Sequence, residues 1–186
     1  MKATGSILFV LLLGVMMVAT DKQAVAADTG KQTVASNVET EKAVIAKVIH
    51  DAICWALTKD RPLQESTMAH ADDLVIFWTN SDTTVFGWNQ YVKLFDIWMD
   101  PRFKATLTEI RDLRINVSRS GDVAWFSATL DDLSEWDGKP KGARDIRWTG
   151  VLEKREGKWV FVQMHGSLAA DRVLEQARRE GKDQAH

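Results

Sequence analysis

The chain has 186 residues, of which 45% are hydrophobic and 27% charged, and its formal net charge is −2. This composition is typical of a globular protein and excludes a disordered one. The nearly balanced charge leaves no basic face of the kind that nucleic-acid binding requires, so we exclude nucleic acid as a partner. Eight tryptophans against one tyrosine predict a bulky apolar core or pocket.

Residues 1–27 have the pattern of a secretory signal peptide. Lys2 supplies the short positive region, Ile7–Ala19 the apolar run, and Ala24–Ala27 small residues for cleavage. The alternative is a membrane anchor, which we disfavour because the apolar run is shorter than the roughly 20 residues a span needs. We therefore expect a periplasmic or secreted protein that has no membrane contact after cleavage.

The rest of the chain divides by composition into a flexible tail, one domain and a polar end. We expect the tail at 28–37, the domain at 38–170, and a C-terminal polar helix with its own tail at 171–186. Cys54 is the single cysteine, so the domain has no internal disulfide and must be stabilised by packing.

Three helices are predicted before the long strands begin. Ser36 and Glu39 fit a capping box at the start of a helix that runs to about Thr58. A short helix at Leu63–Ala69 follows. A third helix begins at Gly87 with aromatic residues on one face, and Asp100-Pro101 ends it.

Strands dominate the second half of the chain. Alternating apolar residues and turn signals predict strands at Leu74–Trp78, Phe103–Ser118 and Asp122–Trp136, then a hairpin at Ala143–Leu168, which turns at Arg155–Lys158. A polar helix at Ala169–Glu180 completes the set. The fold class is α+β: a cone-shaped, curved antiparallel sheet packed against three N-terminal helices, with a pocket between them.

The closing hairpin carries the most specific motifs. These are Arg147-Trp148-Thr149, the turn Glu156-Gly157-Lys158-Trp159, and His165-Gly166-Ser167. In this order they resemble the SnoaL-like branch of the nuclear transport factor 2-like superfamily, and the resemblance implies its cone fold. The fold hosts both enzymes and binding modules, so it does not by itself assign a reaction.

The resemblance also tests known chemistries of the superfamily. Where ketosteroid isomerases carry a catalytic tyrosine and aspartate, this chain has Ala52 and Trp78, so that mechanism is excluded. Where the association domain of calmodulin-dependent kinase has pocket arginines, this chain has Leu130, Gly150 and Gly166. The resemblance therefore implies a pocket that does not select anions.

The same alignment assigns faces to the strands. It places Asp132 and Arg144 on the pocket face near the mouth, with an apolar lining of Trp88, Trp98, Phe126, Leu130, Trp148 and Met164. The outer face receives Trp159 and Phe161 together with a polar cluster of Arg147, Thr149, Gln163, His165 and Ser167. Since members of the superfamily pair through this face, we expect a homodimer that Phe161→Glu weakens.

Other chemistry-bearing groups are interpreted as structural. His165 and Ser167 could form a nucleophilic pair, but side chains two apart on a strand diverge, and a polar cluster is the simpler interpretation. His50 and Cys54 are one helical turn apart without an oxyanion donor. His70, Asp72 and Asp73 lack a second ligand cluster, so we expect no metal and no cofactor.

Two functions remain open, with a purely structural partner-binding domain as a third. We favour an exported domain that binds a small apolar or aromatic ligand, whose polar end Asp132 and Arg144 fix. The alternative is a proton-transfer enzyme (cyclase, isomerase or hydratase) with Asp132 as the base. The pKa of Asp132 discriminates between them: pairing with Arg144 lowers it, whereas burial without a partner raises it. We expect the lowered value.

Overall fold

The computed structural model describes residues 19–183, so most of the predicted signal peptide lies outside the described residues. By its internal contacts the chain forms two units, residues 1–37 and residues 38–186. Of the first unit, residues 19–37 are described, and they are helical. The second unit contains the sheet and the remaining helices.

Helix α1 (Ala19–Cys54) is the longest helix among the described residues. It runs without a break through Ser36, so the capping box predicted there is not a helix start, and the predicted tail at 28–37 belongs to the helix. Within the second unit, Ile45, Ile49 and Ala52 form the buried stripe of α1 and join the core. A 3₁₀ turn, η1 (Trp55–Leu57), extends α1 at its C-terminal end.

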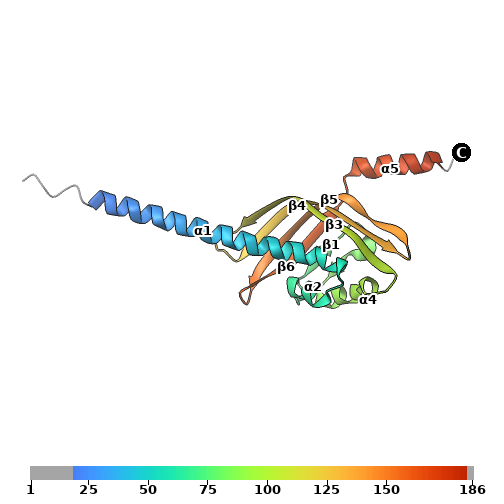
Figure 1. The fold of residues 1–186 in the computed structure, drawn as a ribbon, viewed down its shortest axis with the longest axis horizontal. Helices are drawn as coiled ribbons and strands as arrows, with labels where there is room; N and C mark the ends of the chain where they lie inside the picture. The colour runs from blue at the N-terminus through green and yellow to red at the C-terminus, as the bar shows by residue number, and fades with distance from the viewer. Residues whose placement is uncertain (1–18, 184–186) are drawn as a thin grey trace, which may run out of the picture. The chain divides into compact units, whose positions relative to one another are not determined.

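Short helices gather where α1 ends (Figure 1). Helix α2 (Arg61–Thr67) begins because the Asp60 carboxylate caps it, accepting a hydrogen bond of 3.0 Å from the Leu63 amide, and because Pro62 tolerates the first turn. The predicted third helix is three successive short pieces: α3 (Trp88–Tyr91), the 3₁₀ turn η3 (Val92–Leu94) and α4 (Phe95–Trp98).

The sheet has six strands in the order β2-β1-β6-β5-β4-β3. Their bounds are β1 (Val75–Phe77), β2 (Val85–Phe86), β3 (Phe103–Val117), β4 (Val123–Trp136), β5 (Lys139–Arg155) and β6 (Lys158–Ser167). A 3₁₀ turn, η2 (Ser81–Thr83), connects β1 to β2, and helix α5 (Ala170–Asp183) follows β6. β1 pairs with β6 in parallel, so the sheet is mixed rather than purely antiparallel.

The β5–β6 hairpin turns at Glu156 and Gly157, whose φ angles of 51° and 78° are both positive. Two successive positive φ angles are those of a type I′ turn, whose twist matches the strands it joins. The inner faces of β4, β5 and β6 then meet the stripe of α1, and Trp148, Leu152 and Phe161 are fully buried there. Figure 1 shows this part of α1 crossing the sheet.

Irregularities in the strand pairing decide which side chains face inward. Between β4 and β5, Arg144 and Asp145 together oppose the single residue Asp131, and Asp145 has a positive φ of 54°. Between β5 and β6, Val162 is the extra residue. Each bulge shifts the register by one, and a shift of one residue exchanges the two faces of a strand.

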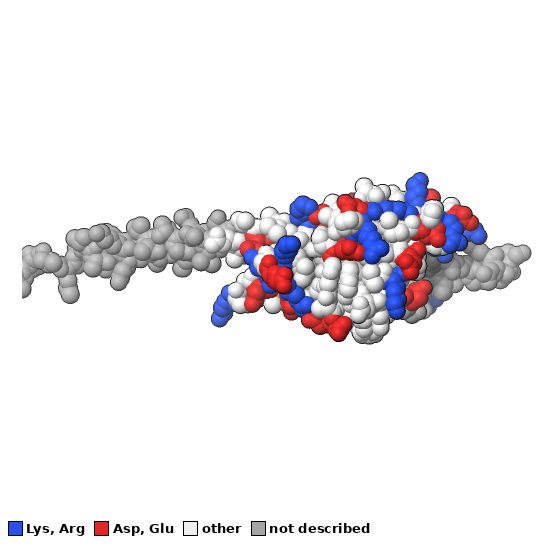
Figure 2. All heavy atoms as spheres, turned by 90° about the horizontal axis from the view of Figure 1, so that it is seen from below, with Lys and Arg blue, Asp and Glu red and all other residues white. Residues whose placement is uncertain are grey.

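No helix within residues 19–183 combines the length and the apolar character needed to cross a membrane. Acidic and basic side chains alternate over the face seen in Figure 2.

Candidate functional site

A pocket of about 110 Å³ opens between the end of α1, the short helices and the inner face of the sheet. Its aromatic walls come from five residues, Trp55, Trp78, Tyr91, Trp98 and Phe103. Its polar groups are Gln64, Thr83 and Asp132, and its aliphatic groups are Ala52, Ile53, Ala56, Ile76, Leu94 and Met164. Lysine, arginine and histidine are absent from this lining, as far as the described residues define it.

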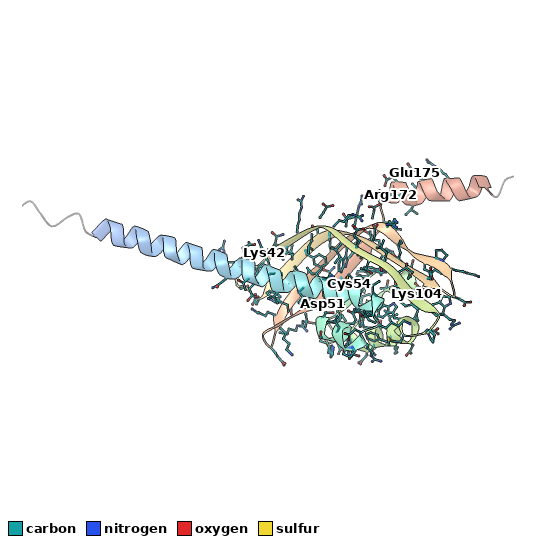
Figure 3. All side chains as sticks on the ribbon, viewed as in Figure 1. Lys42, Asp51, Cys54, Lys104, Arg172 and Glu175 are labelled. Carbon is teal, nitrogen blue, oxygen red and sulfur yellow. The ribbon has the colours of Figure 1, made fainter. Side chains whose placement is uncertain are left out.

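Asp132 is the only acidic residue among the described residues of the lining, and burial raises its pKa from 3.8 to about 6. No salt bridge or hydrogen bond of its side chain occurs among the described residues. The charge of Asp132 is also felt by Cys54 on α1, whose pKa is raised by burial first and then by Asp51 and Asp132. Figure 3 places Cys54 and Asp51 at the C-terminal end of α1.

Asp131, one residue earlier, has the opposite environment. Its carboxylate accepts hydrogen bonds from Arg111 at 2.9 Å, from Arg144 at 2.6 Å and from the amide of Asp145 at 2.8 Å. The Arg111 guanidinium is the main reason that the pKa of Asp131 lies well below its usual range. Asp131 therefore stays ionised and structural, whereas Asp132 can exchange a proton near neutral pH.

The predicted pair of Asp132 and Arg144 is wrong, and the bulge in β5 is the reason. The extra residue at Arg144–Asp145 places Ala143, not Arg144, opposite Asp132. Arg144 is exposed and binds Asp131 on the other face. The expected lowered pKa of Asp132 is therefore also wrong, since its charge partner is absent.

Gly142 fixes the backbone beside this carboxylate. A Cβ at Gly142 would lie 2.0 Å from the carbonyl oxygen of Asp132, and φ at Gly142 is +89°. Both facts require glycine, because no other residue could approach the neighbouring strand so closely in this conformation. The main chain of Asp132 is thus held against β5 while its side chain faces the pocket.

Tyr91 is the second polar group able to act on a ligand. It is buried, and the Gln64 side-chain amide donates a hydrogen bond to its hydroxyl oxygen. Thr67 donates to the backbone carbonyl of Gln64 at 2.7 Å, and its hydroxyl also lies 3.3 Å from the Gln64 side-chain oxygen. No acceptor for the Tyr91 hydroxyl proton occurs among residues 19–183, so this proton can be donated to a ligand in the pocket.

The predicted apolar lining is only partly at the pocket. Trp98 and Met164 line it. Phe126, Leu130 and Trp148 lie deeper, in the core, and Trp88 stacks on His70 with ring centroids 3.8 Å apart. The strand face predicted for Phe126, Leu130 and Trp148 is the buried one, but these side chains and Trp88 do not line the pocket.

Sequence reasoning missed Gln64, Tyr91, Trp55 and Phe103 as pocket residues. The alignment that excluded ketosteroid isomerase chemistry did contain a signal, because the two positions it singled out, Ala52 and Trp78, both line the pocket. These two positions thus marked the location of the pocket, although neither carries an acid or a base.

The outer face holds the predicted polar cluster. Arg147 pairs in register with Ser167, Thr149 with His165, and Val151 with Gln163, all opposite the buried face. Trp159 and Phe161, expected on this outer face, are buried in the core instead, because the bulge at Val162 shifts the register. The Trp159 indole donates to Glu41 on α1 at 2.6 Å.

The remaining candidates do not assemble into a reactive centre. His50 contacts Asp51 at 3.3 Å rather than Cys54. His70 contacts the Glu65 carbonyl at 2.9 Å, and Asp73 binds Arg155. No cluster of histidine, cysteine and acidic side chains suited to a metal ion occurs within the described part of the chain.

Comparison with known families decides the relationship. The model of the SnoaL-like domain matches residues 45–171. The chain belongs to the SnoaL-like domain family. A comparison with curated protein sequences finds no match. The SnoaL-like domain has the nuclear transport factor 2-like fold, as the resemblance implied, and this fold supports ligand binding or isomerase-like chemistry.

Solved structures of the same fold resemble this SnoaL-like domain at low sequence identity. A candidate dehydratase of the NTF2-like family from Streptomyces avermitilis is 14% identical with a TM-score of 0.59, covering 72% of this chain and 99% of its own. An NTF2-like protein from Cytophaga hutchinsonii is 15% identical, with a TM-score of 0.56 and coverages of 69% and 98%. The association domain of C. elegans CaMKII is 15% identical, with a TM-score of 0.52 and coverages of 71% and 98%.

Proposed function

We propose that this SnoaL-like domain is an acid–base catalyst that moves a proton on a small, hydrophobic substrate without an anionic group, as a cyclase, isomerase or hydratase does. One observation carries the proposal: of two adjacent aspartates, Asp131 is paired with arginines and Asp132 is unpaired at the pocket wall. In acid–base sites, different surroundings separate the pKa values of two carboxyl groups, so that one stays ionised while the other exchanges a proton.

Asp132 has the properties of a general base. With a pKa of about 6 it is mostly ionised at neutral pH, yet more basic than an ordinary carboxylate. It would take a proton from a carbon next to a carbonyl group and return it at another position. A module that binds an uncharged ligand gains nothing from an unpaired carboxylate in an apolar pocket, because burial of an unpaired charge costs free energy.

Tyr91 would hold the substrate oxygen. Burial raises the pKa of Tyr91, so the phenol stays protonated and can donate a hydrogen bond. When Asp132 removes the proton, negative charge develops on the carbonyl oxygen, and a donor already in place stabilises it. The hydrogen bond from the Gln64 amide holds the Tyr91 hydroxyl in place.

The lining disfavours an anionic substrate. It offers aromatic faces and no basic side chain, so a carboxylate or phosphate would meet Asp132 without a counter-charge. The fold shared with a candidate dehydratase of the NTF2-like family supports a proton-transfer reaction of this kind.

Hydrogen–deuterium exchange at carbon tests the proposal without knowledge of the natural substrate. Small cyclic ketones such as cyclohexanone, cyclohex-2-enone and 2-indanone are incubated with the protein in D₂O at pH 7.5, and proton NMR follows loss of the signals next to the carbonyl. We expect acceleration by the wild type and at least about a 100-fold loss in Asp132→Asn, the usual worth of a general base.

Asp122→Asn is the matched control, since Asp122 is exposed in the β3–β4 turn. The Asp122→Asn variant should accelerate hydrogen–deuterium exchange of the ketones at the wild-type rate. Equal rates for wild type and Asp132→Asn across the ketones would contradict a role for Asp132 in proton abstraction.

We also propose that the domain forms a homodimer through the outer face of the sheet. Trp125 is 46% exposed there, and Phe77 and Phe86 form an exposed edge-to-face pair at 5.9 Å. The similar fold of an association domain supports self-pairing. Light scattering should give a dimer mass for the wild type and a monomer mass for Trp125→Glu; a monomeric wild type at micromolar concentration would rule the dimer out.

We propose, finally, that the protein is exported. The support is the sequence pattern of Lys2, Ile7–Ala19 and the small residues at Ala24–Ala27. N-terminal sequencing of the exported protein should begin at Ala27 or Asp28, and retention of Met1 in a membrane fraction would overturn the proposal.

A further inference from the structure

Thr108 on β3 has a buried hydroxyl without a hydrogen-bond partner. Within residues 19–183 only one other buried side-chain polar atom shares this state, the indole nitrogen of Trp148. Buried hydroxyls are normally satisfied, because an unmade hydrogen bond costs free energy. An unsatisfied hydroxyl next to the pocket therefore suggests a hydrogen bond that forms when a neighbouring group changes its protonation state.

The strand register supplies that partner. Thr108 stands directly opposite Asp132 in the antiparallel β3–β4 pair. Directly opposite residues project from the same face with Cβ atoms about 4.5–5.5 Å apart. The hydroxyl and carboxylate oxygens lie only one or two bonds beyond these Cβ atoms, so rotation about χ1 brings them within hydrogen-bond reach.

Other groups around Asp132 cannot take this role. On β5 its opposite neighbour is Ala143, which has no polar side-chain atom. On α1 the nearby titratable group is Cys54, a weak donor. Arg111 and Arg144 both bind Asp131 on the other face. Tyr91 lines the pocket with Gln64 as its partner, and no hydrogen bond joins it to Asp132 within residues 19–183.

We propose that Thr108 is a positioning residue whose hydroxyl donates a hydrogen bond to the ionised carboxylate of Asp132 and holds it toward the pocket. The hydroxyl proton rotates freely, so the bond can form when Asp132 loses its proton and break when Asp132 regains it. The site then tolerates both states of its base. The catalytic meaning rests on the proposed function, but the hydrogen bond does not.

The test is an NMR titration of the Asp132 carboxyl carbon in wild type, Thr108→Val and Thr108→Ser, with the resonance identified by its absence in Asp132→Asn. Valine has the shape of threonine without the hydroxyl, and serine keeps the hydroxyl. Removing a donor to the ionised form disfavours that form, so Thr108→Val should raise the Asp132 pKa by about one to two units, the worth of a charge-assisted hydrogen bond. Thr108→Ser should stay near the wild type.

Because Cys54 and Tyr91 both have raised pKa values, they remain protonated while Asp132 titrates. An unchanged or lowered Asp132 pKa in Thr108→Val would overturn the proposal, and so would a serine variant that behaves like valine. Thermal melting at pH 4, where Asp132 is protonated, checks the fold: the valine variant should be at least as stable as the wild type.

The ketone exchange assay separates this proposal from the proposed function. If both hold, the acid limb of the exchange rate moves to higher pH in Thr108→Val by the same shift as the titration. If no ketone exchanges with the wild type while the titration still shifts, Thr108 keeps its place beside Asp132 and the proton-transfer function fails. If the wild type exchanges the ketones but the Asp132 pKa does not shift in Thr108→Val, the proton-transfer function holds and the role of Thr108 fails.

Discussion

Phe161→Glu should unfold the domain. Phe161 is fully buried, with its ring parallel to Trp148 at 6.3 Å between centroids and edge-on to Phe126 at 5.7 Å. A glutamate there would be an unpaired charge in an apolar core, which costs several kcal/mol. That is comparable to the whole stability of a typical domain, about 5–15 kcal/mol. Far-UV circular dichroism and an amide NMR spectrum should show loss of the native state.

Trp125→Glu is the matched control for this experiment. The same charge on the exposed side of β4 should leave the fold intact and change only the molecular mass in solution. A Phe161→Glu variant that stays folded and is monomeric would contradict the buried position of Phe161. It would support the outer-face position that the sequence alone predicted.

Asp132→Asn should stabilise the domain at alkaline pH. The folded state raises the Asp132 pKa from 3.8 to about 6, so the carboxyl favours folding fully below pH 3.8 and loses that contribution as the pH rises through 6. Asparagine does not ionise. The gain at pH 8 should therefore be about 3 kcal/mol, from roughly two pKa units at 1.36 kcal/mol each, and near zero at pH 3.5.

Urea unfolding of both proteins from pH 3.5 to 8 measures this difference. Comparing the two at each pH cancels the acid-labile contribution of Asp131, which is present in both. A variant less stable than the wild type at pH 8 would mean that the folded state stabilises the ionised carboxylate overall, and the raised pKa of Asp132 would be disproved. We expect Asp132→Asn to gain stability and to lose ketone exchange activity, because a charge kept in an active site for catalysis often costs stability.

The strands could be predicted well from the sequence, because a long alternation of apolar and polar residues has one simple structural solution. The strand predicted at Phe103–Ser118 is β3 at Phe103–Val117, and the turn at Glu156-Gly157 is where the sequence places it. The third helix was harder, since Trp88–Trp98 has a helical pattern but divides into short pieces that fit around the pocket.

The faces of β5 and β6 could not be predicted, and the reason is the bulges. An extra residue at Asp145 or Val162 leaves no mark in a strand where apolar residues occur on both faces. Arg144 was thus predicted on the pocket face, and Phe161 on the outer face. Asp132 was found because β4 keeps its alternation up to that point, while Tyr91 was missed because its orientation depends on Gln64, 27 residues earlier.

The bulge at Arg144–Asp145 means that insertions and deletions matter to this site as much as substitutions. Removing Ala143, with the pairing on either side kept, would close the bulge and place Asp145 opposite Asp131 and Arg144 opposite Asp132, where the guanidinium would neutralise the carboxylate. Within a scaffold shared by catalysts and binding modules, the loss of a single codon next to this bulge would therefore convert a proton-transfer site into a closed ion pair.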